Sequence, residues 1–217
     1  RSEMAFLRNR KENDVMKNSY KLSTVLLAAL LLMIMPFTLL AQDAENMSLL
    51  GNWGIGGGEI RAVSNQGDLV YYGVGNVLKI VSFEDPANPY MAGSVVLDDM
   101  VEDIVWTVIG GQTYCVVSGS SLNIINVSNP ITPSLTSTLA LAGYGEGIAI
   151  SGTKVYLAAG STGMEVVDIS DPANPTSIAT AAGSGSGYAE GINVSAPRAY
   201  LGNGANVTIF DISTPSS

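Results

Sequence analysis

Short apolar runs follow one another along the chain and are separated by Gly, Ser, Asn, Asp and Pro. In one stretch the runs fall at 147–150, 155–159, 164–169 and 176–182, a spacing that predicts four β-strands joined by tight turns. From Leu122 to Val127 both strand faces are apolar, because side chains alternate between the two faces of a strand. A sheet with one face in water would alternate apolar and polar positions, so these sheets are predicted to be covered on both faces.

The apolar pattern repeats. Two independent markers, a proline after the third strand of each unit and a glutamate before the first strand, recur with the same period. The prolines are Pro86, Pro130, Pro172 and Pro215, at steps of 44, 42 and 43 residues. The glutamates are Glu59, Glu102, Glu146 and Glu190, at steps of 43, 44 and 44.

A period of about 43 residues with four antiparallel strands is typical of β-propeller blades. The sequence therefore predicts an all-β propeller fragment of about four blades of four strands each. Blades are expected at 59–101, 102–145, 146–189 and 190–217, the last one truncated before its fourth strand. The alternative is a β-solenoid, whose rungs of about 20–30 residues need no Asp-Pro turn once per period.

Three phrases in the repeats resemble the LVIVD repeat: Val-Val-Asp-Ile-Ser-Asp-Pro-Ala-Asn-Pro at 166–175, Leu-Asn-Ile-Ile-Asn-Val-Ser-Asn-Pro at 122–130 and Lys-Val-Tyr-Leu-Ala at 154–158. The resemblance covers about residues 59–215 and implies a β-propeller of a family found largely in exported bacterial and archaeal proteins. The first repeat departs from the family pattern at Ser82-Phe83-Glu84. Family propellers have more blades than this, which implies further repeats beyond Ser217.

The N-terminal part has the features of a secretory leader. Residues 16–41 combine Lys17 and Lys21 with an 11-residue apolar core at 25–35, which predicts a signal helix cleaved after Ala41. Residues 1–15 are interpreted as an upstream segment foreign to the fold. Residues 42–58 are expected to be a linker with a possible ring-closing strand at 47–53. An uncleaved membrane anchor is the alternative, but this apolar stretch is short for a spanning helix.

Composition and charge exclude several functions. Residues 1–41 hold six of the ten Lys and Arg and three of the 19 Asp and Glu, which leaves residues 42–217 with a net charge of −12. Such a surface repels phosphate backbones and anionic lipids, so neither nucleic acid binding nor membrane insertion after cleavage is expected. The chain has no histidine, and its single cysteine, Cys115, lies in an apolar strand-like run and is expected to be buried and inert.

The glutamate series is the candidate site. Glu59, Glu102, Glu146 and Glu190 precede the strand that lines the channel of a propeller, where converging carboxylates would hold a hard cation such as calcium. Alternatively, they cap strand entries or lie in solvent. Asn126, Asp168 and Asp211 are predicted to accept hydrogen bonds in the Ser-Asp-Pro turns rather than to bind a ligand. The acidic pairs Asp98-Asp99 and Glu102-Asp103 are interpreted as a solvated loop; the alternative is a calcium loop, although the spaced D-x-D-x-D-G pattern is absent.

These features predict an exported, non-catalytic module that binds a protein, glycan or small ligand or serves as a scaffold. The module is expected to be secreted, periplasmic or at the cell surface. The alternative is a propeller hydrolase or lactonase with a channel metal held by the glutamates. Such sites usually add further polar ligands, and no second polar residue is expected to repeat beside the glutamates. Fold alone does not decide between the two.

Overall fold

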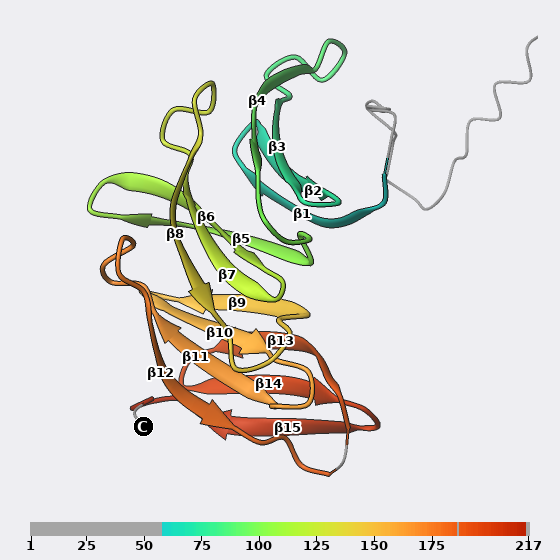
Figure 1. The fold of residues 1–217 in the computed structure, drawn as a ribbon, viewed down its shortest axis with the longest axis vertical. Coiled ribbons are helices and arrows are strands. Elements are labelled where there is room, and N and C mark those ends of the chain that lie inside the picture. The colour runs from blue at the N-terminus through green and yellow to red at the C-terminus, as the bar shows by residue number, and fades with distance from the viewer. Residues whose placement is uncertain (1–57, 186, 216–217) are drawn as a thin grey trace, which may run out of the picture. The chain divides into compact units, whose positions relative to one another are not determined.

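The computed structural model describes residues 58–185 and 187–215, and within them the chain forms fifteen strands in four antiparallel sheets (Figure 1). The predicted upstream segment (1–15), the signal peptide (16–41) and nearly all of the linker with its possible closing strand (42–57) lie outside the described residues. No helix in the described part of the chain is long and apolar enough to cross a membrane.

Each sheet is one sequence repeat. The first consists of β1 (Ile60–Gln66), β2 (Leu69–Val74), β3 (Val77–Ser82) and β4 (Tyr90–Val96). The second consists of β5 (Asp103–Ile109), β6 (Gln112–Ser118), β7 (Ser121–Asn126) and β8 (Ser134–Ala140). The third consists of β9 (Gly147–Ser151), β10 (Lys154–Ala158), β11 (Met164–Asp168) and β12 (Thr176–Ala181). The fourth consists of β13 (Ala189–Ser195), β14 (Arg198–Asn203) and β15 (Asn206–Asp211).

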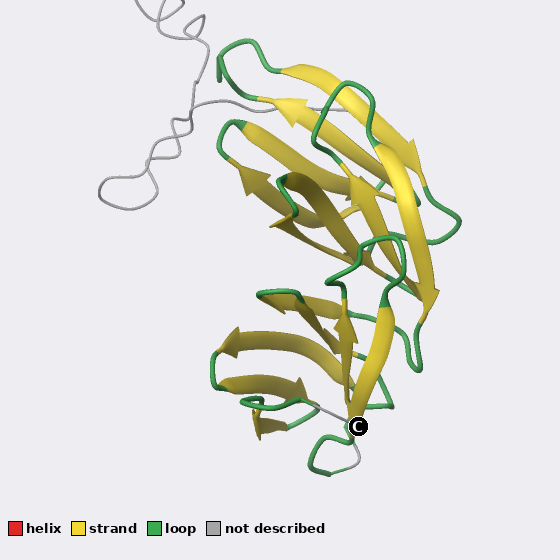
Figure 2. Cartoon of the chain, turned by 90° about the vertical axis from the view of Figure 1, so that its left-hand side faces the viewer, coloured by secondary structure: helices red, strands yellow, loops and turns green. Residues whose placement is uncertain are grey.

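Strands within each sheet lie in chain order, each hydrogen-bonded to the next, as in a meander (Figure 2). The first strands of successive sheets lie against one another, β1 against β5, β5 against β9 and β9 against β13. This arrangement is that of propeller blades whose first strands are innermost. The predicted propeller architecture is therefore confirmed, including a fourth blade of three strands, and the solenoid alternative is wrong.

Apolar cores fill the spaces between successive sheets. Ile80 of the first sheet packs with Ile104 and Ile125 of the second, and Ile124 of the second packs with Leu157 of the third. Because neighbouring residues of β7 point to opposite faces, Ile124 and Ile125 belong to two different cores. The prediction that both faces of each sheet are covered holds for the second and third sheets. Cys115 is a buried free thiol in one of these cores, as expected.

The turns after the third strands follow the predicted chemistry. The backbone carbonyl oxygens of Asp85 and Asp171 accept the backbone N–H groups three residues later, at 2.9 and 3.0 Å. Each hydrogen bond closes a turn that contains the marker proline. The side chains of Asn126, Asp168 and Asp211 each accept the backbone N–H two residues later, at 2.8–2.9 Å. These three residues are turn acceptors, as the sequence predicts.

The third and fourth strands of a sheet share one irregularity. A register shift interrupts their pairing between Ile80 and Val81, between Ile124 and Ile125, and between Val166 and Val167. These three positions are equivalent in the repeat. Because bulges bend a strand and increase its local twist, each complete blade bends its outer strand at the same point.

Candidate functional site

The four glutamates lie where the sequence places them, at the entry to the innermost strands. Glu59, Glu102 and Glu146 directly precede β1, β5 and β9, and Glu190 is the second residue of β13. Their environments differ. The side chain of Glu102 is 6% exposed, whereas that of Glu59 is 75% exposed. The repeat therefore fixes the position of each carboxylate but not its surroundings.

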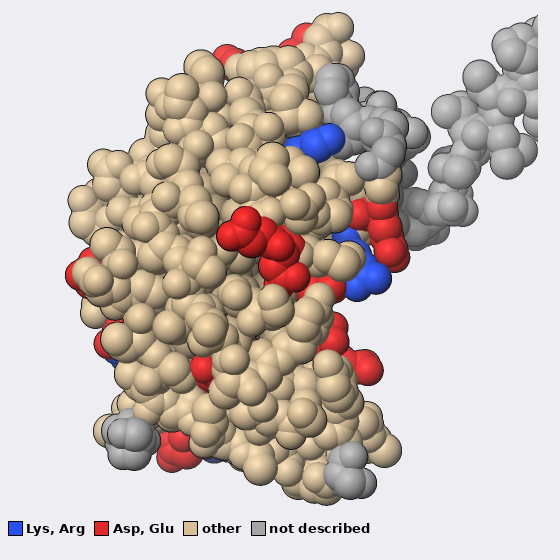
Figure 3. Space-filling view, viewed as in Figure 1, with Lys and Arg blue, Asp and Glu red and all other residues tan. Residues whose placement is uncertain are grey.

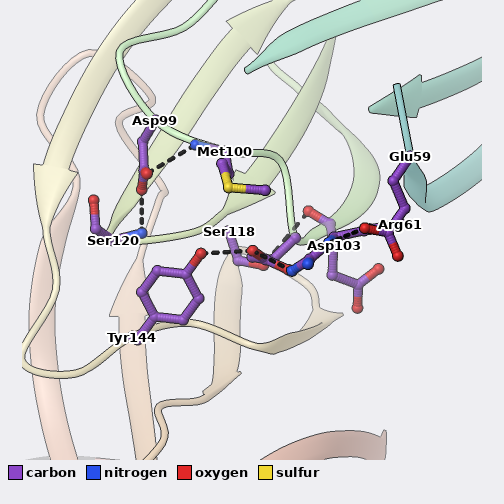
Figure 4. A network of polar contacts seen from close by, with 9 residues as sticks. Glu59, Arg61, Asp99, Met100, Asp103, Ser118, Ser120 and Tyr144 are labelled. Carbon is purple, nitrogen blue, oxygen red and sulfur yellow. Dashed lines mark hydrogen bonds and ion pairs between the residues drawn. The ribbon is translucent and has the colours of Figure 1, made fainter. Parts of the chain in front are cut away.

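Glu102 is held by Arg61 of the first sheet and by Tyr144 of the segment between the second and third sheets, both of which are labelled in Figure 4. Nη1 of Arg61, in β1, donates to both carboxylate oxygens of Glu102 at 2.9 and 3.0 Å. The Tyr144 hydroxyl, which comes from the segment before β9, donates to Oε1 at 2.6 Å. A charged acceptor strengthens these hydrogen bonds, so Glu102 connects the first sheet to the segment that leads into the third sheet.

Arg61 also contacts the preceding glutamate. Its Nε lies 3.4 Å from Oε2 of Glu59, a longer and more exposed contact than the pair with Glu102. The pKa of the Arg61 guanidinium is raised, first by its hydrogen bond to Glu102 and then by the charges of Glu102 and Glu59. One guanidinium thus lies between two carboxylates and balances charge at the junction of the first two sheets.

A second tyrosine, Tyr188, precedes the fourth sheet. Burial, followed by the effect of the Glu146 carboxylate, raises the pKa of Tyr188. The pKa of Tyr144 is likewise raised, by burial and by its hydrogen bond to Glu102. Tyr144 and Tyr188 lie 42 residues after Glu102 and Glu146, and each lies two residues before the next glutamate of the series.

The expectation that no second polar residue repeats beside the glutamates is therefore wrong. The signal is visible in the sequence as Gly-Tyr-Gly-Glu-Gly at 143–147 and Gly-Tyr-Ala-Glu-Gly at 187–191. We refer to these as the Tyr-x-Glu-Gly turns. Met100 and Gly57 occupy the tyrosine position before Glu102 and Glu59.

Asp103 and Asp99 also serve the junctions. Oδ2 of Asp103 accepts the backbone N–H of Ile148, in β9, at 3.0 Å, and burial raises the pKa of Asp103. Asp99 accepts the backbone N–H groups of Met100 and Ser120. Burial opposes the shift, but hydrogen bonds from the Ser120 side chain and from the backbone N–H groups of Met100 and Ser120 hold the pKa of Asp99 below its usual range. Asp103 is thus part of an inter-sheet contact, in contrast to the solvated loop that the sequence suggested.

A further carboxylate lies in the core. Glu165, in β11, is fully buried; its Oε2 accepts the backbone N–H of Ala142 at 2.8 Å and its Oε1 accepts the Ser177 hydroxyl at 2.7 Å. At the equivalent position of β7, the buried Asn123 accepts the Thr138 hydroxyl at 2.9 Å. This position is not evident as a repeat in the sequence, because the residue type changes from Asn123 to Glu165.

The carboxylates do not assemble into a cation site. Among residues 58–185 and 187–215, no three Asp, Glu or Cys side chains are grouped so as to hold a metal ion. In Figure 3 acidic atoms lie in several separate places on a face that is otherwise mostly uncharged, and one of these groups lies next to basic atoms. The calcium hypothesis for Glu59, Glu102, Glu146 and Glu190 draws no support from this geometry and stays a prediction for experiment.

Among the described residues, the Cys115 thiol and the Tyr144 hydroxyl are both kept protonated. The chain has no histidine, and burial raises the pKa of the Cys115 thiol far above its ordinary value, which keeps the thiol protonated. Tyr144 is also held protonated, since its raised pKa disfavours a phenolate. The arrangement is suited to hydrogen bonding and charge pairing between sheets.

Comparisons with solved structures support the fold. The chain is 12% identical to the computationally designed protein Ika4, with a TM-score of 0.57 over 77% of this chain and 99% of that one. It is 11% identical to the computationally designed protein Ika8, again with a TM-score of 0.57, over 70% of this chain, and it spans only 46% of Ika8. At these identities the likeness concerns the fold alone. No curated protein matches the chain.

The repeats themselves match a described family. The family model for the LVIVD repeat matches residues 101–140, 142–180 and 186–217, three successive repeats that include the second, third and fourth sheets. Together these segments make up just over half of the sequence. The chain therefore belongs to the LVIVD repeat family.

Proposed function

We propose that this chain is an exported, non-catalytic β-propeller module that binds a protein, glycan or small ligand, or serves as a scaffold at the cell surface. One observation carries the proposal. Glu102, the most buried member of the glutamate series, has both oxygens engaged by Arg61 and one also by Tyr144. A carboxylate in this setting connects sheets and is poorly placed to activate a substrate.

The other buried acids support the same interpretation. Asp103 binds a backbone N–H of the third sheet, and Glu165 binds the segment between the second and third sheets. Buried carboxylates that bind backbone N–H groups fix the position of one sheet on the next. Rigid sheets with loops at their ends are a common scaffold for recognition, because binding residues concentrate on loops that a rigid framework positions.

The competing function, a hydrolase or lactonase with a channel metal, requires carboxylates that converge on one point. The described residues contain no such group. Such an enzyme also needs a base or a metal-bound water beside the substrate. The Tyr144 and Cys115 side chains are both held protonated and do not supply that base.

The proposal of export rests on the leader pattern of residues 16–41. Expression of the chain from Met16 in a bacterial host tests it directly, through N-terminal sequencing of the product outside the cytoplasm. Cleavage after Ala41 is expected. A product that retains residues 16–41 and stays in the cytoplasm would contradict it.

Calcium titration and a hydrolysis assay separate the module from the enzyme. In the titration, calorimetry of the purified chain with CaCl₂ is expected to show no saturable binding. In the assay, a γ-lactone and a p-nitrophenyl ester are expected to hydrolyse at the buffer rate, with and without calcium. A glycan array probed with the labelled chain then tests recognition without turnover. Calcium-dependent hydrolysis that Glu102→Gln abolishes, while Glu84→Gln retains it, would overturn the proposal.

A further inference from the structure

The strand pairing places one arginine and three glutamates at the same position of the four sheets. In each sheet, the residue six positions before the marker proline pairs with a residue of the second strand, which pairs in turn with one of the first strand. The first-strand residues found in this way are Ser64, Val105, Ala149 and Asn193. Three positions before them lie Arg61, Glu102, Glu146 and Glu190. Arg61 therefore takes the place in the first sheet that the glutamates take in the others, and Glu59 lies two residues before it.

Arg61 neutralises the next member of this series. Its Nη1 donates to both oxygens of Glu102 at 2.9 and 3.0 Å, and its Nε lies 3.4 Å from Oε2 of Glu59 (Figure 4). The Tyr144 hydroxyl donates to the same Glu102 at 2.6 Å. At this junction the molecule thus holds a guanidinium between two carboxylates, next to the tyrosine of a Tyr-x-Glu-Gly turn.

The junction of the third and fourth sheets has two carboxylates and a tyrosine but lacks the cation. The backbones around Glu146 and Glu190 are close, because a Cβ added to Gly147 would lie 2.8 Å from the Glu190 carbonyl oxygen. Within residues 58–185 and 187–215, neither glutamate forms an ion pair. Two like charges held near each other repel, and a shared cation would relieve that repulsion.

The chain's own cations lie elsewhere in the described sheets. After residue 41 the sequence has four Lys and Arg, namely Arg61, Lys79, Lys154 and Arg198. Lys154 and Arg198 lie at the hairpin turns, at the opposite ends of their strands from Glu146 and Glu190. Lys154 is already paired with Asp168, and Lys79 lies in β3 of the first sheet. A cation for Glu146 and Glu190 therefore has to come from a partner.

Tyr188 adds an aromatic ring to the two carboxylates. The ring lies against the backbone of Gly160, since a Cβ added there would lie 2.8 Å from Cζ and from the hydroxyl oxygen, and the residue is 44% exposed. Burial, then the Glu146 carboxylate and the charge of Glu190, raise the pKa of Tyr188, so both acids lie near its hydroxyl. Guanidinium groups stack on aromatic rings and pair with carboxylates through several N–H groups at once.

We propose that Glu146, Glu190 and the ring of Tyr188 form a binding site for a guanidinium group, the arginine side chain of a partner protein. Arg61 between Glu59 and Glu102 is the model for this contact within the same molecule. Tyr188 and Glu190 are exposed rather than enclosed, which suits a side chain presented by a protein better than a small ligand. The net charge of −12 over residues 42–217 attracts such a partner. The inference rests on the proposed function as a binding module and names the chemistry of one partner.

A peptide titration of the purified full chain tests the site. The probe is N-acetyl-Gly-Arg-Gly-amide at low salt, followed by NMR of the ¹⁵N-labelled protein. We expect saturable shifts of the amide signals of Gly147 and Gly191, which follow the two glutamates. The matched peptide with citrulline in place of arginine, which has the same shape without the charge, is expected not to bind. The lysine peptide is expected to bind at least about threefold more weakly.

Substitutions assign the contact to its three residues. Glu146→Gln and Glu190→Gln are each expected to weaken binding of the arginine peptide by about tenfold. Tyr188→Leu is expected to weaken it by about threefold, whereas Tyr188→Phe, which keeps the ring, is expected to retain binding. Glu84→Gln, at an exposed site in the first sheet, is the matched control and is expected to change nothing. Signals of the other sheets show whether each variant is folded.

Three outcomes would overturn the inference. The first is the absence of saturable shifts at Gly147 and Gly191 up to about 20 mM arginine peptide. The second is binding that neither glutamate substitution weakens. The third is equal binding of the arginine, lysine and citrulline peptides. None of these contradicts the proposed module, whose glycan and protein ligands are tested separately.

Mass spectrometry of the recovered peptide separates the site from the proposed function. Intact peptide is expected after binding to a non-catalytic module. A peptide that binds through Glu146 and Glu190 and is then cleaved would support the site and contradict the proposed function.

Discussion

The second and fourth sheets are made from the same repeat but differ in what surrounds them. Ile124 of the second sheet is fully buried, whereas its equivalent in the fourth, Ile209, is 59% exposed. Glu102 is bound by Arg61 and Tyr144, whereas Glu190 has no such neighbour among the described residues. Burial in this molecule is therefore supplied by the neighbouring repeat, which is the nearest-neighbour behaviour of repeat proteins.

Truncation of an apolar side chain should give the largest difference in stability loss between the second and fourth sheets. Ile124→Ala removes methyl groups from a filled core between two sheets and is expected to lower the free energy of unfolding by about 2–5 kcal/mol. Ile209→Ala removes the same atoms from a solvent-exposed face and is expected to cost at most about 1 kcal/mol. Urea denaturation of both variants measures the difference. Equal losses would show that the fourth-sheet face is buried in solution.

Neutralising the glutamates should give the next largest difference. Glu102→Gln removes a charged acceptor from a buried site next to Arg61 and is expected to lower the free energy of unfolding by about 1–3 kcal/mol. Glu190→Gln in the same chain is expected to leave it unchanged. If both variants behave as wild type, the contacts of Glu102 contribute nothing to stability.

The smallest expected effect concerns pH. The hydrogen bond from Lys154 and that from the Ser170 backbone hold the pKa of Asp168 below its ordinary value. An acid with a depressed folded-state pKa stabilises the fold above its unfolded pKa, and this contribution is lost as the pH falls through the folded value. The melting temperature should therefore decline below about pH 4. Asp168→Asn should reduce that decline, by an amount equivalent to less than about 1 kcal/mol in the free energy of unfolding. If the variant declines as steeply as wild type, Asp168 does not contribute to the pH dependence of stability.

The blades were predictable because the period, the proline turns and the two-sided apolar strands all depend on local sequence. The third-sheet strands agree with the predicted runs to within about a residue, and the turn roles of Asn126, Asp168 and Asp211 follow from their spacing to the prolines. Local sequence carries such information, since turn and strand chemistry act over a few residues.

The partners of the glutamates were not predicted. Arg61 and Tyr144 reach Glu102 from 41 and 42 residues away, so the contact depends on how one sheet packs on the next. The repeated tyrosine was present in the sequence, but its role becomes clear only when two repeats are placed side by side. Asp103 was assigned to a solvated loop for the same reason, because its partner, the Ile148 N–H, belongs to the next sheet.

The most direct test of the account is a double-mutant cycle on Glu102→Gln and Tyr144→Phe, measured by urea denaturation in EDTA and again in calcium. The account predicts a coupling energy of at least about 0.5 kcal/mol between the two sites, with the same value in both buffers. No coupling in EDTA, together with a calcium-dependent stabilisation that Glu102→Gln abolishes, would contradict it and would restore the glutamates as metal ligands.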